Sequence, residues 1–232
     1  EYTLELSTRP EKSIGSDEIW EKAETALKNT LNKRGTKFQL NPGDGAFYGP
    51  KIDFHIADSI GRTWQTATIQ LDFAMPERFE LEYTAEDGSK QRPVMLHRVI
   101  FGAVERFIGI LVEELAGAFP LWLSPVQVKI LTVGEKQKEY ASEILLKLKA
   151  EMIRAELDQS DESLGKKIRN AEIEKVPVVW IIGEKETESG KVSQRPRKDY
   201  TGKTDRAASL ADGTVDVTES IEAIKMVIEN KM

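Results

Sequence analysis

One stretch of the sequence combines a long apolar stripe with glycines and a cation. Residues 94–115 place apolar side chains at three- and four-residue spacing, which is typical of an amphipathic helix. Gly102 and Gly109 interrupt it, and each interior glycine costs a helix roughly 1 kcal/mol relative to alanine. Close approach of a sheet or a ligand to the helix backbone would offset that cost and leave Arg106 as a fixed cation beside it. A plain helix-on-sheet contact, with Arg106 paired to a local carboxylate, explains the pattern equally well.

A second candidate is a row of polar side chains on one predicted strand, residues 62–73. Apolar residues occupy the other side of the same strand. Uncharged polar groups in a row on a central strand indicate the floor of a ligand site, although a solvent-exposed antiparallel face is the commoner explanation. By strict alternation Gln65 lies on the apolar side, so it can share a ligand with Thr68 only if a β-bulge separates them. The polar row comprises Thr66, Thr68, Gln70 and Asp72.

The glycine-rich loop and the histidines limit the remaining chemistry. Residues 41–51 contain three glycines and two prolines, and such a loop can present backbone N–H groups to a ligand, although composition alone favours a simple turn. The chain has two histidines, His55 and His97, and no cysteine. A conventional four-ligand zinc site of nitrogen and sulfur cannot be assembled from this chain alone. A lone histidine more often caps a helix or hydrogen-bonds in a core.

The elements that must position these residues fall into two predicted domains, residues 1–122 and 126–232. The first combines strands with long helices, and the boundary lies at residues 121–125. Beyond it, strands alternate with helices and the strands are apolar on both faces, which predicts a mixed, mainly parallel α/β sheet. We expect strands at residues 2–7, 52–56, 62–73, 79–83, 126–133, 154–157, 176–183 and, as a last edge strand, 192–197. Helices are expected at 16–35, 94–115, 135–150, 163–174 and 217–232, and a mobile loop at 199–212.

Composition excludes several classes of protein. The net charge is −6, so any nucleic-acid surface must be a local basic patch. No apolar run is long enough to span a bilayer. We expect the sequence to be a fragment of a longer chain, so its lack of a signal peptide carries little weight. The absence of cysteine fits a reducing compartment, so we expect a cytoplasmic protein. Basic residues gather in the second domain, where a solvated surface is an equally good explanation: Lys166, Lys167, Arg169, Lys175, Arg195, Arg197 and Lys198.

Several stretches of the chain resemble the class II aminoacyl-tRNA synthetases, most closely the threonyl-tRNA synthetase family. Residues 97–111, HRVIFGAVERFIGIL, resemble motif 3 of that class. Residues 119–131 resemble the join to the family's anticodon-binding domain. The remaining matches lie at residues 7–20, 43–56 and 64–79. The resemblance implies the distal part of an α+β antiparallel class II catalytic core, followed by an α/β mixed-sheet anticodon-binding domain.

The same resemblance implies an activity and a set of site residues. The family uses ATP with Mg²⁺ to activate threonine as threonyl-adenylate, then transfers it to tRNA(Thr). Arg106 is implied as the catalytic residue and binds ATP together with Gln65 and Thr68. His97 is implied as one ligand of a Zn²⁺ ion whose other ligands lie upstream of Glu1. The implied threonine pocket comprises Tyr48, Lys51 and Gln70, and the implied anticodon contacts are Glu186, Arg195, Lys167, Arg169 and Lys175.

The sequence departs from the family pattern at three positions. Ala103 stands where a serine is usual, and Asp161 and Ser163 stand where an amide and a lysine are usual. The resemblance also implies that motifs 1 and 2 lie outside these 232 residues. This polypeptide alone is therefore expected not to activate threonine. The resemblance also implies that the complete enzyme is a homodimer.

Two alternatives remain open at this stage. One is a sister class II synthetase for prolyl, glycyl or histidyl transfer, which the amino-acid dependence of the full-length enzyme would settle. The context of His97 and of residues 45–51 argues against it. The other is a non-catalytic tRNA-binding protein on the same scaffold. ATP binding that is unchanged in an Arg106→Ala variant would favour this second alternative.

Overall fold

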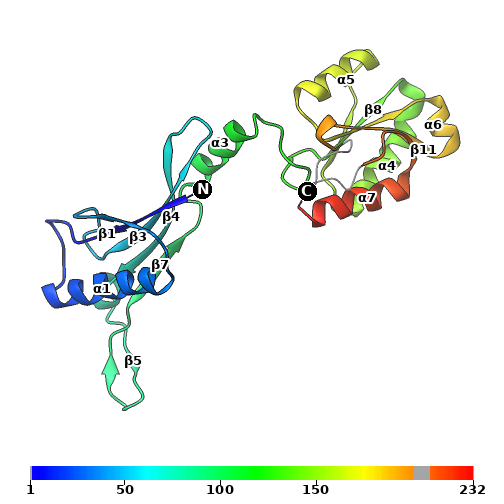
Figure 1. Ribbon diagram of the computed structural model, residues 1–232. Helices are drawn as coiled ribbons and strands as arrows, with labels where there is room; N and C mark the ends of the chain where they lie inside the picture. The colour runs from blue at the N-terminus through cyan, green and yellow to red at the C-terminus, as the bar shows by residue number, and fades with distance from the viewer. Residues whose placement is uncertain (1, 201–209, 232) are drawn as a thin grey trace. The chain divides into compact units, whose positions relative to one another are not determined.

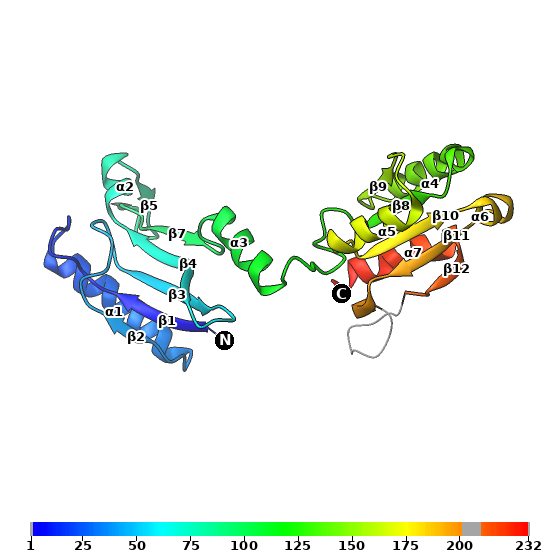
Figure 2. The ribbon, with the colours of Figure 1, turned by 90° about the horizontal axis from the view of Figure 1, so that it is seen from above.

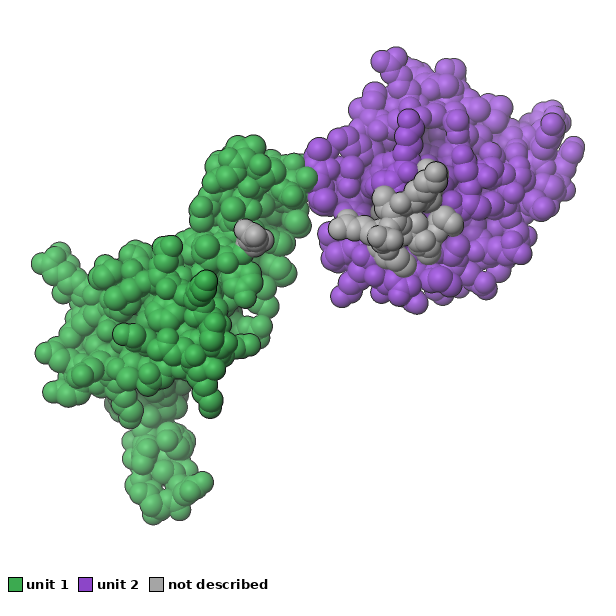
Figure 3. All heavy atoms as spheres, in the orientation of Figure 1, with its two compact units in different colours: residues 1–114 green, residues 115–232 purple. Residues whose placement is uncertain are grey.

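The computed structural model describes residues 2–200 and 210–231, which form two compact units, residues 1–114 and 115–232 (Figure 3). Each unit has its own sheet and its own hydrophobic core. Across the described part of the chain, no helix has the length and apolar character needed to cross a membrane.

The first unit is built on a five-stranded sheet (Figure 1). Its strands pair antiparallel, except that β1 and β2 run parallel. A short helix, α2 (Ala74–Arg78), follows the sheet's longest strand, and a small hairpin of β5 (Tyr83–Thr84) and β6 (Lys90–Gln91) comes next. The strand order across the sheet is β2 (Gln39–Asn41), β1 (Tyr2–Ser7), β3 (Lys51–Ala57), β4 (Thr63–Asp72) and β7 (Met95–Val99).

Helix α1 (Asp17–Lys33) covers one face of this sheet. Ser16 caps its first turn by accepting the backbone N–H of Ile19, as the serine and the two acidic residues behind it predict. Its buried residues include Leu27 and Leu31, which pack against Leu4, Leu6 and Ile52 of the sheet. Because side chains alternate along a strand, the polar neighbours of these apolar residues are left on the opposite face.

The predicted strand at residues 79–83 is wrong for all but its last residue. The carboxylate of Asp72 accepts the backbone N–H groups of Ala74 and Met75 at 2.8 and 3.0 Å. These bonds satisfy the first donors of α2, so the chain leaves β4 as a helical turn rather than as a strand. Extended structure resumes only at Tyr83.

The predicted helix at residues 94–115 is correct only in its second half. Residues 95–99 form β7, and α3 (Val104–Glu114) begins after a short loop. Gly102 lies in that loop with a φ of +65°, a conformation that favours glycine, and a Cβ there would stand 3.0 Å from the carbonyl oxygen of Thr66. The expected close approach is therefore confirmed at Gly102. It is wrong at Gly109, where no described atom would lie within 4 Å of a Cβ.

A β-bulge interrupts the pairing of β3 with β4. Phe54 pairs with Ala67 whereas His55 pairs with Gln65, so Thr66 is an extra residue on β4. The bulge reverses the alternation and turns Gln65 toward the face that carries Thr68. The bulge that the sequence required for these two side chains to share a ligand is thus present.

The turn between β3 and β4 is held by Asp58. Its carboxylate accepts the indole N–H of Trp64, the guanidinium of Arg62 and the backbone N–H groups of Arg62 and Ile60. Arg62 also pairs with Glu113 of α3. Burial acts to raise the pKa of Asp58, but these donors outweigh it and lower the pKa from 3.8 to about 2.

This lowered pKa predicts how the stability of the first unit depends on pH. A carboxylate whose pKa is lowered by folding stabilises the folded state above its unfolded pKa of 3.8, and this stability is lost as the pH falls through the folded pKa of about 2. We expect Asp58→Asn to lower the melting temperature at neutral pH, and the gap from the wild type to narrow between about pH 4 and about pH 2. Circular dichroism melts across that range measure it, with Glu86→Gln in the exposed hairpin as a control of equal charge change. A gap that stays constant down to pH 2 contradicts the assignment.

The second unit contains a five-stranded mixed sheet (Figure 2). Helices α4 (Lys138–Ala150) and α7 (Val217–Glu229) pack on one face, and α5 (Leu164–Ile173) packs on the other. A short helix, α6 (Glu184–Ser189), precedes β11, and 3₁₀ turns occur at Glu135–Gln137 and Lys198–Tyr200. The strand order is β12 (Gly213–Asp216), β11 (Lys191–Pro196), β10 (Val178–Ile182), β8 (Val128–Thr132) and β9 (Ala155–Asp158).

The predicted fold class is confirmed in both units, with one topological correction. β8, β9 and β10 pair in parallel, whereas β11 and β12 pair antiparallel. The prediction that β11 is the last and outermost strand is wrong, because β12 pairs along it. Pro196 is tolerated there because it lies beyond the ladder with β12, which pairs only with residues 191–194 of β11, while the N–H of Arg197 still bonds the carbonyl of Pro177 on the other side. Of the loop expected at residues 199–212, residues 201–209 lie outside the described residues.

Candidate functional site

A cavity of about 540 Å³ lies on the face of the first unit's sheet that α1 leaves uncovered. Its walls come from the loop before β3, from β3, β4 and β7, and from the start of α3. All seven residues that the sequence singled out for nucleotide, amino acid, metal and catalysis line this one cavity: Tyr48, Lys51, Gln65, Thr68, Gln70, His97 and Arg106. The structure therefore brings them together, although they span almost sixty positions of the chain.

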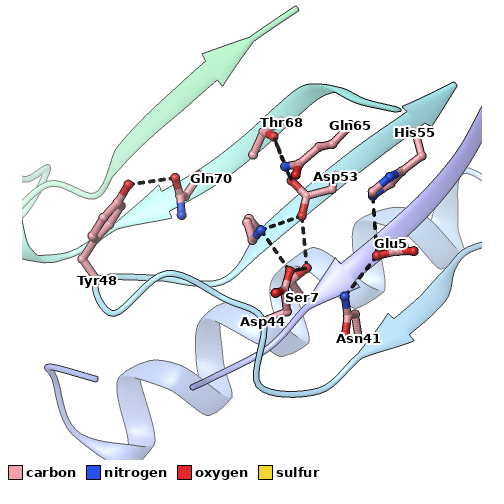
Figure 4. A network of polar contacts seen from close by, with 11 residues as sticks. Glu5, Ser7, Asn41, Asp44, Tyr48, Asp53, His55, Gln65, Thr68 and Gln70 are labelled. Carbon is pink, nitrogen blue, oxygen red and sulfur yellow. Dashed lines mark hydrogen bonds and ion pairs between the residues drawn. The ribbon is translucent and has the colours of Figure 1, made fainter. Parts of the chain in front are cut away.

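The floor of the cavity is organised around the buried carboxylate of Asp53 (Figure 4). One carboxylate oxygen, Oδ1, accepts Gln65 Nε2 at 2.6 Å and Thr68 Oγ1 at 2.8 Å. The other, Oδ2, accepts Ser7 Oγ at 3.1 Å and lies 2.9 Å from Lys51 Nζ. Asp53 thus contacts three of the predicted site residues from below.

Lys51 is held between two carboxylates. Its Nζ lies 2.9 Å from Asp53 and 3.1 Å from Asp44. Burial acts to lower the pKa of Lys51, but hydrogen bonds and charge interactions with Asp53 and Asp44 outweigh it and leave the pKa above its ordinary value. Lys51 is therefore a permanent cation at neutral pH.

The loop that carries Tyr48 is docked tightly against β4. The hydroxyl of Tyr48 donates to Gln70 Oε1 at 3.0 Å (Figure 4), and its carbonyl accepts the backbone N–H of Phe73 at 3.2 Å. A Cβ on the neighbouring Gly49 would stand 1.9 Å from the carbonyl oxygen of Leu71. Only glycine permits this approach, so the glycine-rich loop is a structural requirement of the cavity wall.

His97 reaches the cavity from a strand rather than from a helix start. Its Nε2 lies 2.7 Å from the carboxylate of buried Asp72, which also accepts the N–H groups of Ala74 and Met75. Burial acts to raise the pKa of Asp72, but the bonds from Met75, His97 and Ala74 hold it below its usual value. Asp72 is therefore an acceptor, and Nδ1 is the ring nitrogen that remains for a metal.

The described residues do not form a complete zinc site by themselves. Within residues 2–200 and 210–231, no three His, Asp or Glu side chains form a group that could hold a metal ion. A half-exposed imidazole with a carboxylate behind it is nevertheless the ordinary arrangement of a metal-binding histidine. The position and surroundings of His97 therefore fit those of one ligand of a zinc site.

Arg106 lies in the first turn of α3 and reaches back over the cavity. Its guanidinium donates to the backbone carbonyl of Gln65 at 2.5 Å. An arginine has five N–H donors, so this anchor leaves others for a ligand. The absence of a side chain at Gly102 makes room for the guanidinium, because a Cβ there would stand 2.9 Å from Nη2 of Arg106.

The five anticodon candidates are distributed over the second unit. Lys167 is only 3% exposed and lies 4.0 Å from Asp158, in a small cavity that Asp161 also lines. Lys175 donates to the carbonyl of Ala116. Glu186 accepts the backbone N–H of Gly183 in the first turn of α6. Arg169 on α5 and Arg195 on β11 are exposed, and they are the two candidates most accessible to RNA.

Sequence reasoning missed the buried carboxylate of Asp53 and the contact of Asp72 with His97. Asp53 alternates with apolar residues in an ordinary strand, so the pattern marks it only as a polar residue, whereas Asp72 was placed in the predicted polar row without a role. A usable signal existed for Asp53, because a charge within a strand beside a row of threonine and glutamine suggests a hydrogen-bonded network. Asp44, which binds Lys51, was missed because it lies in an irregular loop.

Comparisons with known proteins identify the families of the two units. A family model described as the tRNA synthetase class II core domain (G, H, P, S and T) matches residues 6–115, and an anticodon binding domain model matches residues 127–226. A threonine–tRNA ligase of Clostridium botulinum is 54% identical over 231 residues, which cover 100% of this chain and 35% of that protein. The chain belongs to the threonyl-tRNA synthetase family. The threonine–tRNA ligase of Acetivibrio thermocellus is 61% identical over 198 residues, 85% of this chain and 31% of that protein.

A solved structure from the same family agrees with the fold. The crystal structure of the RNA binding domain of threonyl-tRNA synthetase from Cryptosporidium parvum Iowa II aligns with a TM-score of 0.86 and 37% identity, over 98% of this chain and 55% of that one. These relatives favour the threonyl family over its sister class II families. The chain spans about a third of the length of the curated threonyl-tRNA synthetases that it matches.

Proposed function

We propose that, within its complete protein, this chain forms one wall of a site that activates threonine with ATP for transfer to tRNA(Thr). The observation that supports this most strongly is the single cavity lined by all seven residues that the family pattern assigns to that reaction. Arg106 gives the cavity an exposed cation, which suits the phosphates of ATP.

The proposed reaction needs no protein nucleophile. The threonine carboxylate attacks the α-phosphate of ATP, the bond to pyrophosphate breaks, and threonyl-adenylate forms. The protein would contribute by holding the two substrates in line and by stabilising the charge on the transferring phosphoryl group. Arg106 would bind the adenine face and the phosphates, Gln65 and Thr68 would bind the nucleotide, and Tyr48, Lys51 and Gln70 would border the amino acid.

His97 would be one ligand of a zinc ion that, when bound, supplies a Lewis acid for the amino and hydroxyl groups of threonine. Valine has a similar shape but no hydroxyl, so such a site would discriminate against it by leaving a polar position unfilled. Asp72 would keep the imidazole oriented through Nε2.

The second unit would bind the anticodon arm of tRNA(Thr). Exposed Arg169 and Arg195 and the carboxylate of Glu186 are groups of the kind that contact phosphates and read base edges in single-stranded RNA. As in the family, we expect a homodimer. The chain contains no cysteine, which is consistent with a reducing cytoplasm.

Threonine-dependent ATP–pyrophosphate exchange by the complete protein tests the proposal. Exchange that depends on threonine supports it. Exchange that depends on proline, glycine or histidine instead would assign the protein to a sister synthetase. No exchange with any amino acid, together with retained tRNA binding, would favour the non-catalytic alternative.

Replacement of His97 provides a separate readout on metal. We expect His97→Ala to lower the zinc affinity of the complete protein by at least about tenfold, because changes at or behind a metal ligand have effects of that size. Metal content measured after dialysis against a graded chelator checks this. His55→Ala is the matched control, since His55 faces Glu5 outside the cavity. Equal zinc retention in both variants contradicts the assignment of His97.

A further inference from the structure

The hydrogen-bonding groups beneath the cavity determine which end of the Gln65 amide faces the ligand. The carboxylate of Asp53 can only accept hydrogen bonds, and it is 1% exposed and lies 2.6 Å from Gln65 Nε2 (Figure 4). The nitrogen of Gln65 must therefore point down toward Asp53. Its amide oxygen is turned the other way, toward the cavity that Gln65 lines.

The protons of this network can be assigned one by one. Thr68 Oγ1 donates its proton to Asp53 Oδ1, so it accepts when Gln65 Nε2 approaches at 3.1 Å. Nε2 of Gln65 thus donates to both Asp53 and Thr68. The amide nitrogen is held by partners within the protein, and Oε1 of Gln65 is left as the acceptor for a ligand.

Gln70, two residues beyond Thr68, has the opposite arrangement. Its Oε1 accepts the hydroxyl of Tyr48 at 3.0 Å, so its NH₂ group remains for a ligand. The two glutamines of β4 therefore present opposite polarities to the cavity, one an acceptor and the other a donor.

We propose that Asp53 is a positioning residue that fixes Gln65 as a hydrogen-bond acceptor, so that this wall selects a ligand carrying a hydroxyl or amino donor. The inference rests on the proposed function only for the identity of that ligand, for which ATP offers its ribose hydroxyls and its adenine amino group. Asp53 itself does not touch the ligand. It acts through Gln65 and Thr68.

The variant Asp53→Asn reverses this polarity with almost no change of shape. The cation of Lys51 stands 2.9 Å from Oδ2, so the oxygen of the new amide stays beside Lys51 and its NH₂ group faces Gln65. The Gln65 amide must then turn over and present its NH₂ group to the ligand. We expect KM for ATP in the complete protein to rise about tenfold or more, because a mispaired buried polar group has an effect of that order.

A compensating variant separates positioning from general damage. When Asp53→Asn is combined with Gln65→Glu, the NH₂ group at position 53 donates to one carboxylate oxygen at position 65, and the other oxygen again faces the ligand as an acceptor. Gln65→Glu alone places two carboxylates together and should be as impaired as the first variant. Recovery of most of the lost ATP affinity in the double variant supports the proposal. A double variant no better than the worse single variant overturns it.

A measurement on the 232-residue chain itself does not depend on the catalytic function. The side-chain NH₂ protons of Gln65 should exchange slowly with solvent in nuclear magnetic resonance spectra of the wild type. They should also do so in Ser7→Ala, which removes a partner from the other oxygen of Asp53. Loss of this protection in Asp53→Asn supports the inference, and equal protection overturns it. If the complete protein shows no threonine-dependent exchange, the proposed function fails while this comparison still decides the role of Asp53.

Discussion

Replacing Arg106 by alanine in the complete protein is expected to lower threonine-dependent ATP–pyrophosphate exchange by about 100- to 1,000-fold, the usual effect of deleting one preorganised donor to a developing charge. The guanidinium is anchored by the backbone carbonyl of Gln65, and the gap at Gly102 admits it. It is therefore already in place before the ligand arrives. That preorganisation is the reason for expecting a large effect from an exposed side chain.

Arg98→Ala is the matched control for this experiment. Arg98 precedes Val99 on β7 and follows His97, so by alternation it lies on the face of the sheet away from the cavity. The Arg98→Ala change removes one positive charge, as Arg106→Ala does, from the neighbouring strand β7. Similar losses in both variants would indicate a general effect of charge rather than a catalytic role. Unchanged exchange in Arg106→Ala would contradict the catalytic role of Arg106, whereas unchanged ATP binding in a protein without exchange activity would support the non-catalytic tRNA-binding alternative.

Replacing Gly49 by alanine is expected to destabilise the first unit by about 2–3 kcal/mol, toward the upper end for overpacking a tight site. The added methyl group would stand 1.9 Å from the carbonyl oxygen of Leu71 and 2.7 Å from its carbon, and both are backbone atoms that cannot rotate away. The loop must withdraw from β4. The bonds from Leu71 to Pro50 and from Phe73 to Tyr48 would then be weakened.

Urea unfolding followed by the tryptophans of the first unit measures this effect. Gly109→Ala provides the control, since Gly109 lies inside α3 and no described atom would meet its Cβ. It should stabilise α3 by about 0.5–1 kcal/mol, the difference in helix propensity between the two residues. A Gly49→Ala protein as stable as the wild type would show that the loop is not held against β4 as described.

The fold was largely predictable because its signals are local. The Ser16 cap, the apolar spacing of α1 and the alternation along β3 and β4 each depend on a few neighbouring residues. The split of residues 94–115 into β7 and α3 was not predictable in this way. Apolar residues at residues 95–101 satisfy either period, and the deciding factors are the pairing of Gln70 with His97 and the positive φ of Gly102. The first is a tertiary contact, and the second is a backbone conformation found where Gly102 lies close to the carbonyl of Thr66.

The sequence predicted which residues line the cavity, but it did not predict the contacts that hold them in place. The family pattern named seven of the residues that line the cavity, while alternation alone placed Gln65 on the wrong face and required the bulge at Thr66 to correct it. The roles of these residues stay predictions. In the second unit, composition treated Lys167 as one of a set of surface cations, whereas α5 buries it against Asp158. A count of charges carries no information about which of them the packing encloses.

The unpaired Thr66 of β4 also determines how this segment can change length during evolution. Loss of Thr66 alone would leave Ala67 opposite Phe54 and Gln65 opposite His55, which is the pairing already present, so both faces of the strand would be kept. Loss of both Thr66 and Ala67 would instead place Gln65 opposite Phe54, on the apolar face. The bulge is therefore a point at which β4 can lose one residue, but not two, without exchanging its faces.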